Sequence, residues 1–394
     1  MSRRQHAPEP VPALITTSAD LAALCERLRR ESFVTVDTEF MRERTYWPEL
    51  CVVQLAGEHE VAVVDALAPD LDLAPLGALL ADRNVMKVFH AARQDIEIFL
   101  LKFDAVPVPL FDTQVAAMVA GFGDQVSYDA LCRALAGTHI DKAHRFSDWS
   151  ARPLSAAQIA YAAADVTHLR RIYIALRDRL EREGRLDWVA EEMAALADPA
   201  TYRIDPETAW ERLRPRTHNR RLLGLLRAAA AWREREAQRI NIPRQRLVRD
   251  ETLLELAATG PETPAELARA RGISEGFAKG RSGAGLIAAL KAAKALPESE
   301  LPEPPRDRHG PSPSPALVAL LKVLLAAKSE EHHVAPKLLA SSDDLDRLAA
   351  EDRPDLPALH GWRREVFGNA ALALKTGKLA LGVEGRKVKL IGAD

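Results

Sequence analysis

Short runs of β-branched and other apolar residues recur between about residues 33 and 111 and alternate with polar connections. Three runs come first. Each of the two later runs follows a segment in which apolar residues repeat with helical spacing, at 73–81 and 91–102. Three strands in succession, followed by alternating helix and strand, predict a mixed sheet covered by helices. The expected strands are 33–37, 50–56, 61–65, 85–89 and 106–111.

A long helix is predicted from Ser155 onward. Gln158 follows three residues later, which is the spacing of a capping box, and Gly184 supplies a stop after a run rich in Leu, Ala and Arg. Beyond residue 205 the β-type runs fade and the spacing is helical, with prolines as breaks.

A proline-rich, polar segment at 296–314 predicts a linker. It separates two helical blocks of similar size, 214–295 and 315–394, and the second ends in the basic, strand-like G-V-E-G-R-K-V-K-L. We therefore expect a disordered N-terminus at 1–12, a first domain at 13–208, and two small all-α domains joined by the linker.

Composition adds mainly exclusions. The 394 residues are 47% hydrophobic and 28% charged with a formal net charge of −2, and no apolar stretch is long enough for a membrane span. The three cysteines, Cys25, Cys51 and Cys132, are odd in number and widely spaced, so we expect buried thiols in a reducing compartment. The N-terminus does not resemble a secretory signal, which favours the cytoplasm and no membrane partner.

Four acidic residues occur in unusual surroundings. Asp37 and Glu39 end the first apolar strand one residue apart, which places both on one face. Asp95 lies one turn into a helix, and Asp165 stands among alanines with Tyr161 four residues before it on the same helical face. Any one of these acids could be a solvated charge or a helix cap.

The set as a whole is harder to explain as separate solvated charges. If the four carboxylates converge, their repulsion would raise their pKa values and destabilise the fold unless cations bind there. Hard divalent ions such as Mg²⁺ take oxygen ligands, and a pair of them can stabilise both the attacking and the leaving oxygen of a phosphodiester.

In their order along the chain, these motifs resemble the DEDD superfamily of exonucleases, in its tyrosine-bearing subgroup. Asp-x-Glu, the helical Asp and Tyr-x-x-x-Asp are its three motifs. The strings D-T-E-F-M-R-E-R-T-Y-W-P-E-L-C-V-V-Q-L, F-D-T-Q-V-A-A and S-D-W-S-A-R-P-L, with Y-A-A-A-D-V, are similar to the ribonuclease D family over about residues 12–200. The resemblance implies a ribonuclease H-like α/β exonuclease domain.

The same resemblance implies roles for the motif residues. Asp37, Glu39 and Asp165 would ligate one of two divalent metal ions, Mg²⁺ or Mn²⁺. Asp37 would also reach the second ion, and Asp95 would support it directly or through water. Tyr161 would orient the attacking water through its hydroxyl.

Three further residues near the motifs have competing interpretations. His90 is expected to pack beneath the site or to hydrogen-bond locally. Asp112 is expected to cap a helix, in preference to a catalytic role. Phe40 could stack on a terminal base or belong to the core.

The first helical block is rich in arginine. Between Arg214 and Asp250 there are eleven arginines and three acids, which suggests a phosphate-binding surface, although arginines on a helix can simply be solvated. The pieces W-R-E-x-E-A and P-R-x-x-L-V-x-D-E-x-L-L-E-L-A resemble the helicase-and-ribonuclease-D C-terminal (HRDC) domain, and block 315–394 resembles a degenerate second copy. The candidate RNA contacts are Phe40, Arg220, Arg221, Trp232 and Arg233.

Taken together, the resemblance implies a metal-dependent, monomeric 3′–5′ exoribonuclease that releases nucleoside 5′-monophosphates and trims tRNA precursors with 3′ extensions. A DNA exonuclease of the proofreading or Werner type shares the carboxylates and is one alternative. A catalytically silent RNA-binding scaffold is the other.

Overall fold

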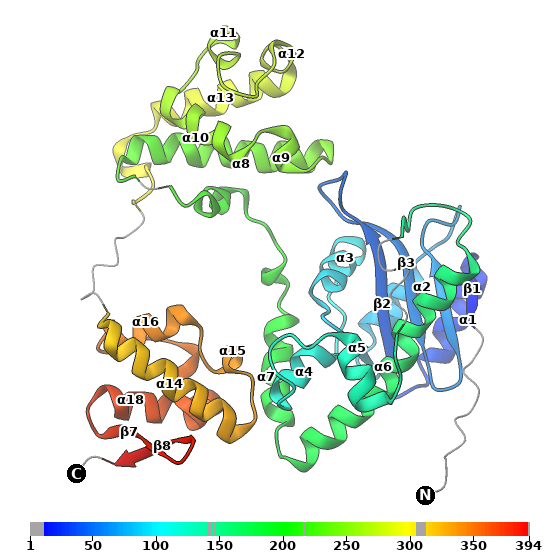
Figure 1. Cartoon of the computed structure of the whole chain (residues 1–394). Coiled ribbons are helices and arrows are strands. Elements are labelled where there is room, and N and C mark those ends of the chain that lie inside the picture. The colour runs from blue at the N-terminus through cyan, green and yellow to red at the C-terminus, as the bar shows by residue number, and fades with distance from the viewer. Residues whose placement is uncertain (1–11, 141–143, 145–146, 216, 305–312, 393–394) are drawn as a thin grey trace, which may run out of the picture. The chain divides into compact units, whose positions relative to one another are not determined.

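The computed structural model describes residues 12–140, 144, 147–215, 217–304 and 313–392 (Figure 1). The predicted disorder at 1–11 and the centre of the predicted linker, 305–312, lie outside these residues. Where the chain is described, it groups into two compact units. The first is Met1–Glu39, Leu50–Thr201 and Arg308–Asp394, and the second is Phe40–Glu49 with Tyr202–Asp307.

The first unit contains a six-stranded mixed sheet in the order β1-β4-β3-β2-β5-β6 (Figure 1). The antiparallel pairing of β3 with β4 and the place of β2 next to β3 confirm the predicted meander, whereas β5 lies parallel to both β2 and β6. The strands are β1 Ala13–Ile15, β2 Phe33–Met41, β3 Glu49–Ala56, β4 Val61–Asp65, β5 Met86–Phe89 and β6 Leu110–Asp112.

Both edge strands differ from the sequence prediction. The sequence did not indicate β1, because three residues are too short for a periodic signal; it is fixed by parallel pairing with β4. The strand predicted at 106–111 is reduced to 110–112. Pro107 and Pro109 have no backbone N–H to donate, which prevents regular pairing over the first part of that run.

Helices cover the sheet and carry two of the motif acids. Ser155 and Gln158 form the predicted capping box of the longest helix, α6, and Gly184 follows its end with a positive φ of 65°. The Thr35 hydroxyl on β2 donates to the carbonyl of Val166, at 2.8 Å, and so holds the middle of α6 against the sheet. The helices are α1 Ser18–Leu28, α2 Ala74–Ala81, α3 Arg93–Phe103, α4 Thr113–Val119, α5 Tyr128–Leu131, α6 Ala156–Arg182 and α7 Leu186–Leu196.

The second unit is a small helical domain around a core of Leu, Ala and Ile side chains. The segment Phe40–Glu49, which follows the first motif, belongs to it. Asn241 accepts hydrogen bonds from the backbone N–H groups of Tyr46 and Trp47, at 3.1 and 3.0 Å, and Tyr46 donates its hydroxyl proton to Glu234, at 2.5 Å. The helices are α8 Arg220–Ile240, α9 Arg244–Leu247, α10 Asp250–Thr259, α11 Pro264–Leu267, α12 Glu275–Lys279 and α13 Arg281–Ala295.

The C-terminal block is helical but not all-α, because its strand-like ending forms an antiparallel hairpin of β7 and β8. It groups with the first unit. The rings of Trp188 and Trp362 stack at 4.5 Å, and Arg363 forms ion pairs with Glu191 and Glu192. The elements are α14 Pro315–His332, α15 Pro336–Leu339, α16 Ser342–Ala350, α17 Gly361–Arg363, α18 Asn369–Lys375, β7 Leu379–Glu384 and β8 Lys387–Gly392.

The three cysteines are free and buried, as predicted. Among the described residues there is no helix with the length and apolarity needed to span a bilayer.

Candidate active site

The four predicted acids come from three elements of the first unit. Asp37 and Glu39 lie on β2, Asp95 lies in the first turn of α3, and Asp165 lies in the middle of α6. These positions follow from the fold, since α3 begins after β5, the parallel neighbour of β2, and α6 is tied to β2 through Thr35.

Electrostatics show that the acids converge. Burial raises the pKa of Asp37 well above its ordinary value, and the charge of Asp165 raises it further. Burial also raises the pKa of Glu39 to about 9, with additional contributions from Asp37, Asp165 and Asp95. Each ionised carboxylate therefore disfavours ionisation of its neighbours, as predicted for a converging set.

Tyr161 and Asp165 are coupled by a hydrogen bond. Burial raises the pKa of Asp165 to about 7, and the hydrogen bond from the Tyr161 side chain opposes this shift by stabilising the carboxylate. The four-residue spacing predicted that the two side chains share a helical face, and the structure confirms it.

A cavity of about 520 Å³ opens over these residues. Asp37, Tyr161 and Asp165 line it, together with His90. Its wall includes five residues that sequence reasoning missed: Gln114, Gln125, Ser127, Tyr128 and Asp129.

Tyr128 contacts the main chain of α6 at Asp165. Its hydroxyl donates to the main-chain carbonyl of Asp165, and the ring centroid lies 5.4 Å from that of His90. Burial raises the pKa of Tyr128 well above its ordinary value, so the phenol stays protonated and remains a donor. Ser127 caps α5 and Tyr128 follows it, a local pattern that does not predict the contact of Tyr128 with α6.

Asp112 caps a helix, as predicted. Its carboxylate accepts from the backbone N–H of Gln114 at 2.8 Å, and also from those of Ala91 and Ala92 at 3.0 and 2.8 Å. Asp112 thereby fixes the turn that leads from β5 into α3, the helix on which Asp95 lies.

His90 forms the local hydrogen bond that was one of its two expected roles. Its Nδ1 lies 3.0 Å from the Thr113 hydroxyl, which itself donates to the carbonyl of Phe89. A backbone hydrogen bond with Val126 also engages the His90 ring. His90 lines the cavity rather than packing beneath it.

The donor set suits hard divalent cations. Four carboxylates supply only oxygen ligands, and burial raises the pKa of each, a shift that bound cations would oppose. Within the described ranges no three His, Cys, Asp or Glu side chains are already arranged around one ion position.

One candidate RNA contact in the second unit, Arg233, is corrected by its burial, whereas RNA contact by Trp232, Arg220 and Arg221 stays a prediction. Arg233 is only 2% exposed, with its guanidinium bonded to the Val248 carbonyl at 2.8 Å and to Asp250 at 2.7 Å. Trp232 packs on the domain core, 6.3 Å from the ring of Phe277. Both therefore serve the fold of this domain.

The two arginines at the start of α8 also have internal partners. Arg220 donates to the carbonyl of Leu301 at 2.8 Å, and Arg221 donates to that of Leu296 at 2.5 Å. They fasten the chain that leaves α13. Phe40 is half-buried at the end of β2, and its stacking on a base stays a prediction.

Comparison with known protein families identifies two domains in the chain. Residues 12–181 match the family model of the 3′–5′ exonuclease domain, and residues 223–290 match that of the HRDC domain. The first match includes all four carboxylates and Tyr161.

Full-length relatives extend the agreement to the whole chain. Ribonuclease D of Granulibacter bethesdensis is 71% identical over 392 residues, 99% of each chain, and that of Gluconacetobacter diazotrophicus is 68% identical over the full length of both. The crystal structure of Escherichia coli RNase D, described as an exoribonuclease involved in structured RNA processing, matches 93% of this chain and 99% of its own, with 32% identity and a TM-score of 0.80. The chain therefore belongs to the ribonuclease D family of 3′–5′ exoribonucleases.

Proposed function

We propose that this exoribonuclease uses two divalent metal ions, Mg²⁺ or Mn²⁺, to release nucleoside 5′-monophosphates from the 3′ end of RNA, with tRNA precursors carrying 3′ extensions among its substrates. The observation that carries the proposal is the electrostatic coupling of Asp37, Glu39, Asp95 and Asp165, two of which, Asp37 and Asp165, line one cavity. We further propose that the chain works as a monomer in the cytoplasm, where its buried thiols stay reduced.

The carboxylates have distinct proposed tasks. Asp37, Glu39 and Asp165 would hold one ion, Asp37 would share the second, and Asp95 would support the second ion directly or through water. Bound ions supply positive charge to the phosphate and lower the pKa of a bound water. The four carboxylates must be ionised to bind metal. Their mutual repulsion opposes ionisation when no cation is bound.

Tyr161 is assigned to the attacking water. Its hydroxyl is hydrogen-bonded to Asp165 and lies on the cavity wall, so it can hold a water by its oxygen without giving up its own proton. Tyr161 would then orient the water for in-line attack, and it lies on the same helix as the proposed metal ligand Asp165.

The proposal of RNA rather than DNA as substrate rests on relatives and on the second unit. Escherichia coli RNase D is described as involved in structured RNA processing, and this chain matches 99% of its length with a TM-score of 0.80. The HRDC match and the arginine-rich α8 region add a nucleic-acid-binding module. A DNA exonuclease uses the same carboxylates and is the second candidate.

A direct assay tests the proposal. With Mg²⁺ or Mn²⁺ and a 3′-labelled RNA, the purified chain should release labelled mononucleotides, and EDTA should abolish the reaction. Rates on tRNA precursors, unstructured RNA and single-stranded DNA identify the preferred substrate class.

Asp37→Asn tests the need for the carboxylate charge, because it keeps the volume of the side chain and removes one ligand charge. It should lower the rate at least 100-fold. Oligonucleotides as first products, or an unchanged rate in Asp37→Asn, would show that the proposed mechanism is wrong.

A further inference from the structure

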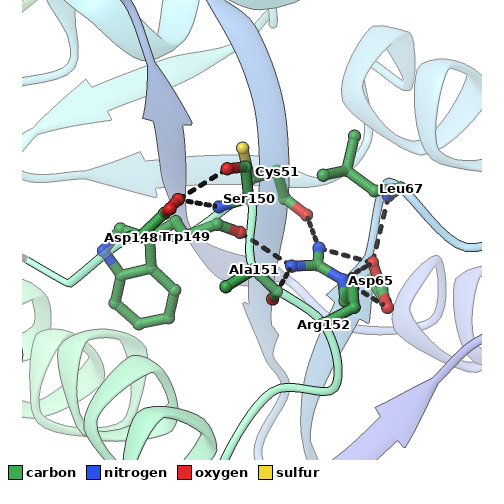
Figure 2. A network of polar contacts seen from close by, with 8 residues as sticks. All are labelled: Cys51, Asp65, Leu67, Asp148, Trp149, Ser150, Ala151 and Arg152. Carbon is green, nitrogen blue, oxygen red and sulfur yellow. Dashed lines mark hydrogen bonds and ion pairs between the residues drawn. The ribbon is translucent and has the colours of Figure 1, made fainter.

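Arg152, in the S-D-W-S-A-R-P-L string, fastens the segment before α6 to the sheet (Figure 2). Its Nη2 donates to the Asp65 carboxylate at 2.6 Å and to the Cys51 carbonyl at 2.9 Å, while Nε donates to both Asp65 oxygens at 2.9 Å. Its Nη1 turns back to the carbonyls of Trp149 and Ala151, at 2.7 and 2.8 Å. One guanidinium thus joins β3, the end of β4 and its own loop.

Both partners of the ion pair are held firmly. Asp65 is 7% exposed and also accepts from the backbone N–H of Leu67, at 3.1 Å. The Arg152 side chain is 25% exposed, and the planar fork meets the carboxylate through two nitrogens. Such charge-assisted, two-point contacts fix orientation as well as distance, which a lysine at the same position could not do.

The fastened loop carries a tryptophan that reaches the site. Trp149 is 2% exposed, and its ring centroid lies 6.1 Å from that of Tyr161. His144 lies on the same loop and meets Tyr161 edge-on at 6.3 Å. The loop that Arg152 fastens to the sheet therefore packs against the ring of Tyr161.

We propose that Arg152 is a positioning residue for RNA hydrolysis, acting through Trp149 to hold the Tyr161 ring so that its hydroxyl faces the attacking water. The inference rests on the proposed role of Tyr161. It gives a role to the polar network that joins the loop to β3 and β4 (Figure 2).

Kinetics on the full chain test the inference with Arg152→Gln, Arg152→Lys and Asp65→Asn. We expect kcat on a 3′-labelled RNA to fall about 10- to 100-fold, with KM changed less than about threefold, because a misplaced group costs rate rather than binding. Near-ultraviolet circular dichroism should change as Trp149 shifts. Arg27, on α1, forms a two-nitrogen ion pair with Glu60, and Arg27→Gln should leave kcat and the spectrum unchanged.

A double-mutant cycle separates positioning from general stability. If Arg152 acts through Tyr161, Arg152→Gln should cost less than about threefold in a Tyr161→Phe background, because the group it positions is already gone. Equal losses in both backgrounds would overturn the inference while leaving the proposed role of Tyr161 intact. Full activity of Tyr161→Phe alone would overturn that role and, with it, the inference.

If Arg152→Gln folds poorly, Trp149→Phe provides a second test of the inference. It keeps the ion pair and removes only the larger ring that packs on Tyr161. Its kcat should fall in the wild-type background and change little in Tyr161→Phe. A wild-type kcat in Trp149→Phe would overturn the inference.

Discussion

Thr38 donates its hydroxyl proton to the carboxylate of Asp95, joining the strand that carries two of the site's acids to the helix that carries a third. Thr38 lies between Asp37 and Glu39 on β2 and is 6% exposed. Burial raises the pKa of Asp95 well above its ordinary value, and this hydrogen bond acts against the shift. Thr38 therefore both orients Asp95 and helps it to ionise.

Thr38→Val should weaken metal binding without removing any proposed ligand. The valine keeps the volume but cannot donate, so Asp95 loses the partner that favours its charged form. We expect a loss of about 10- to 100-fold in metal affinity or activity, the usual effect of losing a hydrogen-bond partner of a ligand. Titration of activity against Mg²⁺ measures it.

Thr252→Val is the control for Thr38→Val. It removes another buried hydroxyl, which donates to the Arg271 carbonyl in the second unit, at 2.8 Å. It should leave the Mg²⁺ dependence unchanged. An identical Mg²⁺ titration for Thr38→Val and the wild type would refute the assigned role of Thr38.

Without metal, the chain should lose stability as the pH rises. The pKa of Glu39 goes from an ordinary 4.5 to about 9 in the folded chain, and that of Asp165 goes from 3.8 to about 7. Between these limits the folded state holds protons that the unfolded state has released. Unfolding free energy is thus greatest below the ordinary pKa values and falls toward the folded ones.

Thermal melts in EDTA from pH 5 to pH 9 measure this dependence. The melting temperature of the first unit should fall with pH, and Glu39→Gln should flatten the fall because it removes one titrating group. Saturating Mg²⁺ should raise the melting temperature most at high pH, where the carboxylates are ready to bind. A melting temperature that rose with pH in EDTA would contradict the electrostatics of the site.

Local rules predicted the motif geometry from the sequence. Strand alternation put Asp37 and Glu39 on one face, helical spacing put Tyr161 beside Asp165, and the capping box marked the start of their helix. All of these are relationships within a few residues. The contact of Tyr128 with the carbonyl of Asp165 spans 37 residues, and that of Arg152 with Asp65 spans 87, so local periodicity cannot reveal either one.

Arg233 shows how composition alone misled the prediction. An excess of arginine suggested a charged surface, yet Leu226, Ala230, Arg233 and Ala237 follow one another at spacings of four, three and four, which is the buried face of α8. That spacing was the available signal. The guanidinium is accommodated in the interior because Asp250 and the Val248 carbonyl accept its protons.

Arg233→Gln should therefore destabilise the second unit rather than weaken RNA binding directly. Leaving buried polar partners unsatisfied costs about 1–3 kcal/mol of unfolding free energy. Arg235→Gln removes an exposed ion pair with Glu207 and should cost less than about 1 kcal/mol. Chemical denaturation of both variants gives the comparison, and equal stability of the two would contradict burial of Arg233.

Arg363 should hold the C-terminal block to the exonuclease domain. Its guanidinium, 11% exposed, pairs with Glu191 and Glu192 beside the stacked Trp188 and Trp362. Arg363→Gln leaves two adjacent acids facing each other without a cation. Limited proteolysis should then release a fragment of about residues 315–394 faster than from the wild type. Arg353→Gln, a change elsewhere in the same block, should leave the cleavage rate unchanged, and equal rates for all three proteins would refute this docking role.

Exposed arginines after α8 are better candidates for phosphate contact than those at its start. Arg246 and Arg249 are exposed, whereas Arg220, Arg221 and Arg233 are engaged within the domain. Each lost phosphate contact should lower the slope of log affinity against log salt by about 0.7–0.9. Arg246→Gln/Arg249→Gln should thus flatten the salt dependence of structured-RNA binding by up to about 1.8, while cleavage of a short single strand is kept. Lys279→Gln controls for loss of charge in the same domain, and an unchanged slope in the double variant would mean that these arginines are solvated rather than bound to RNA.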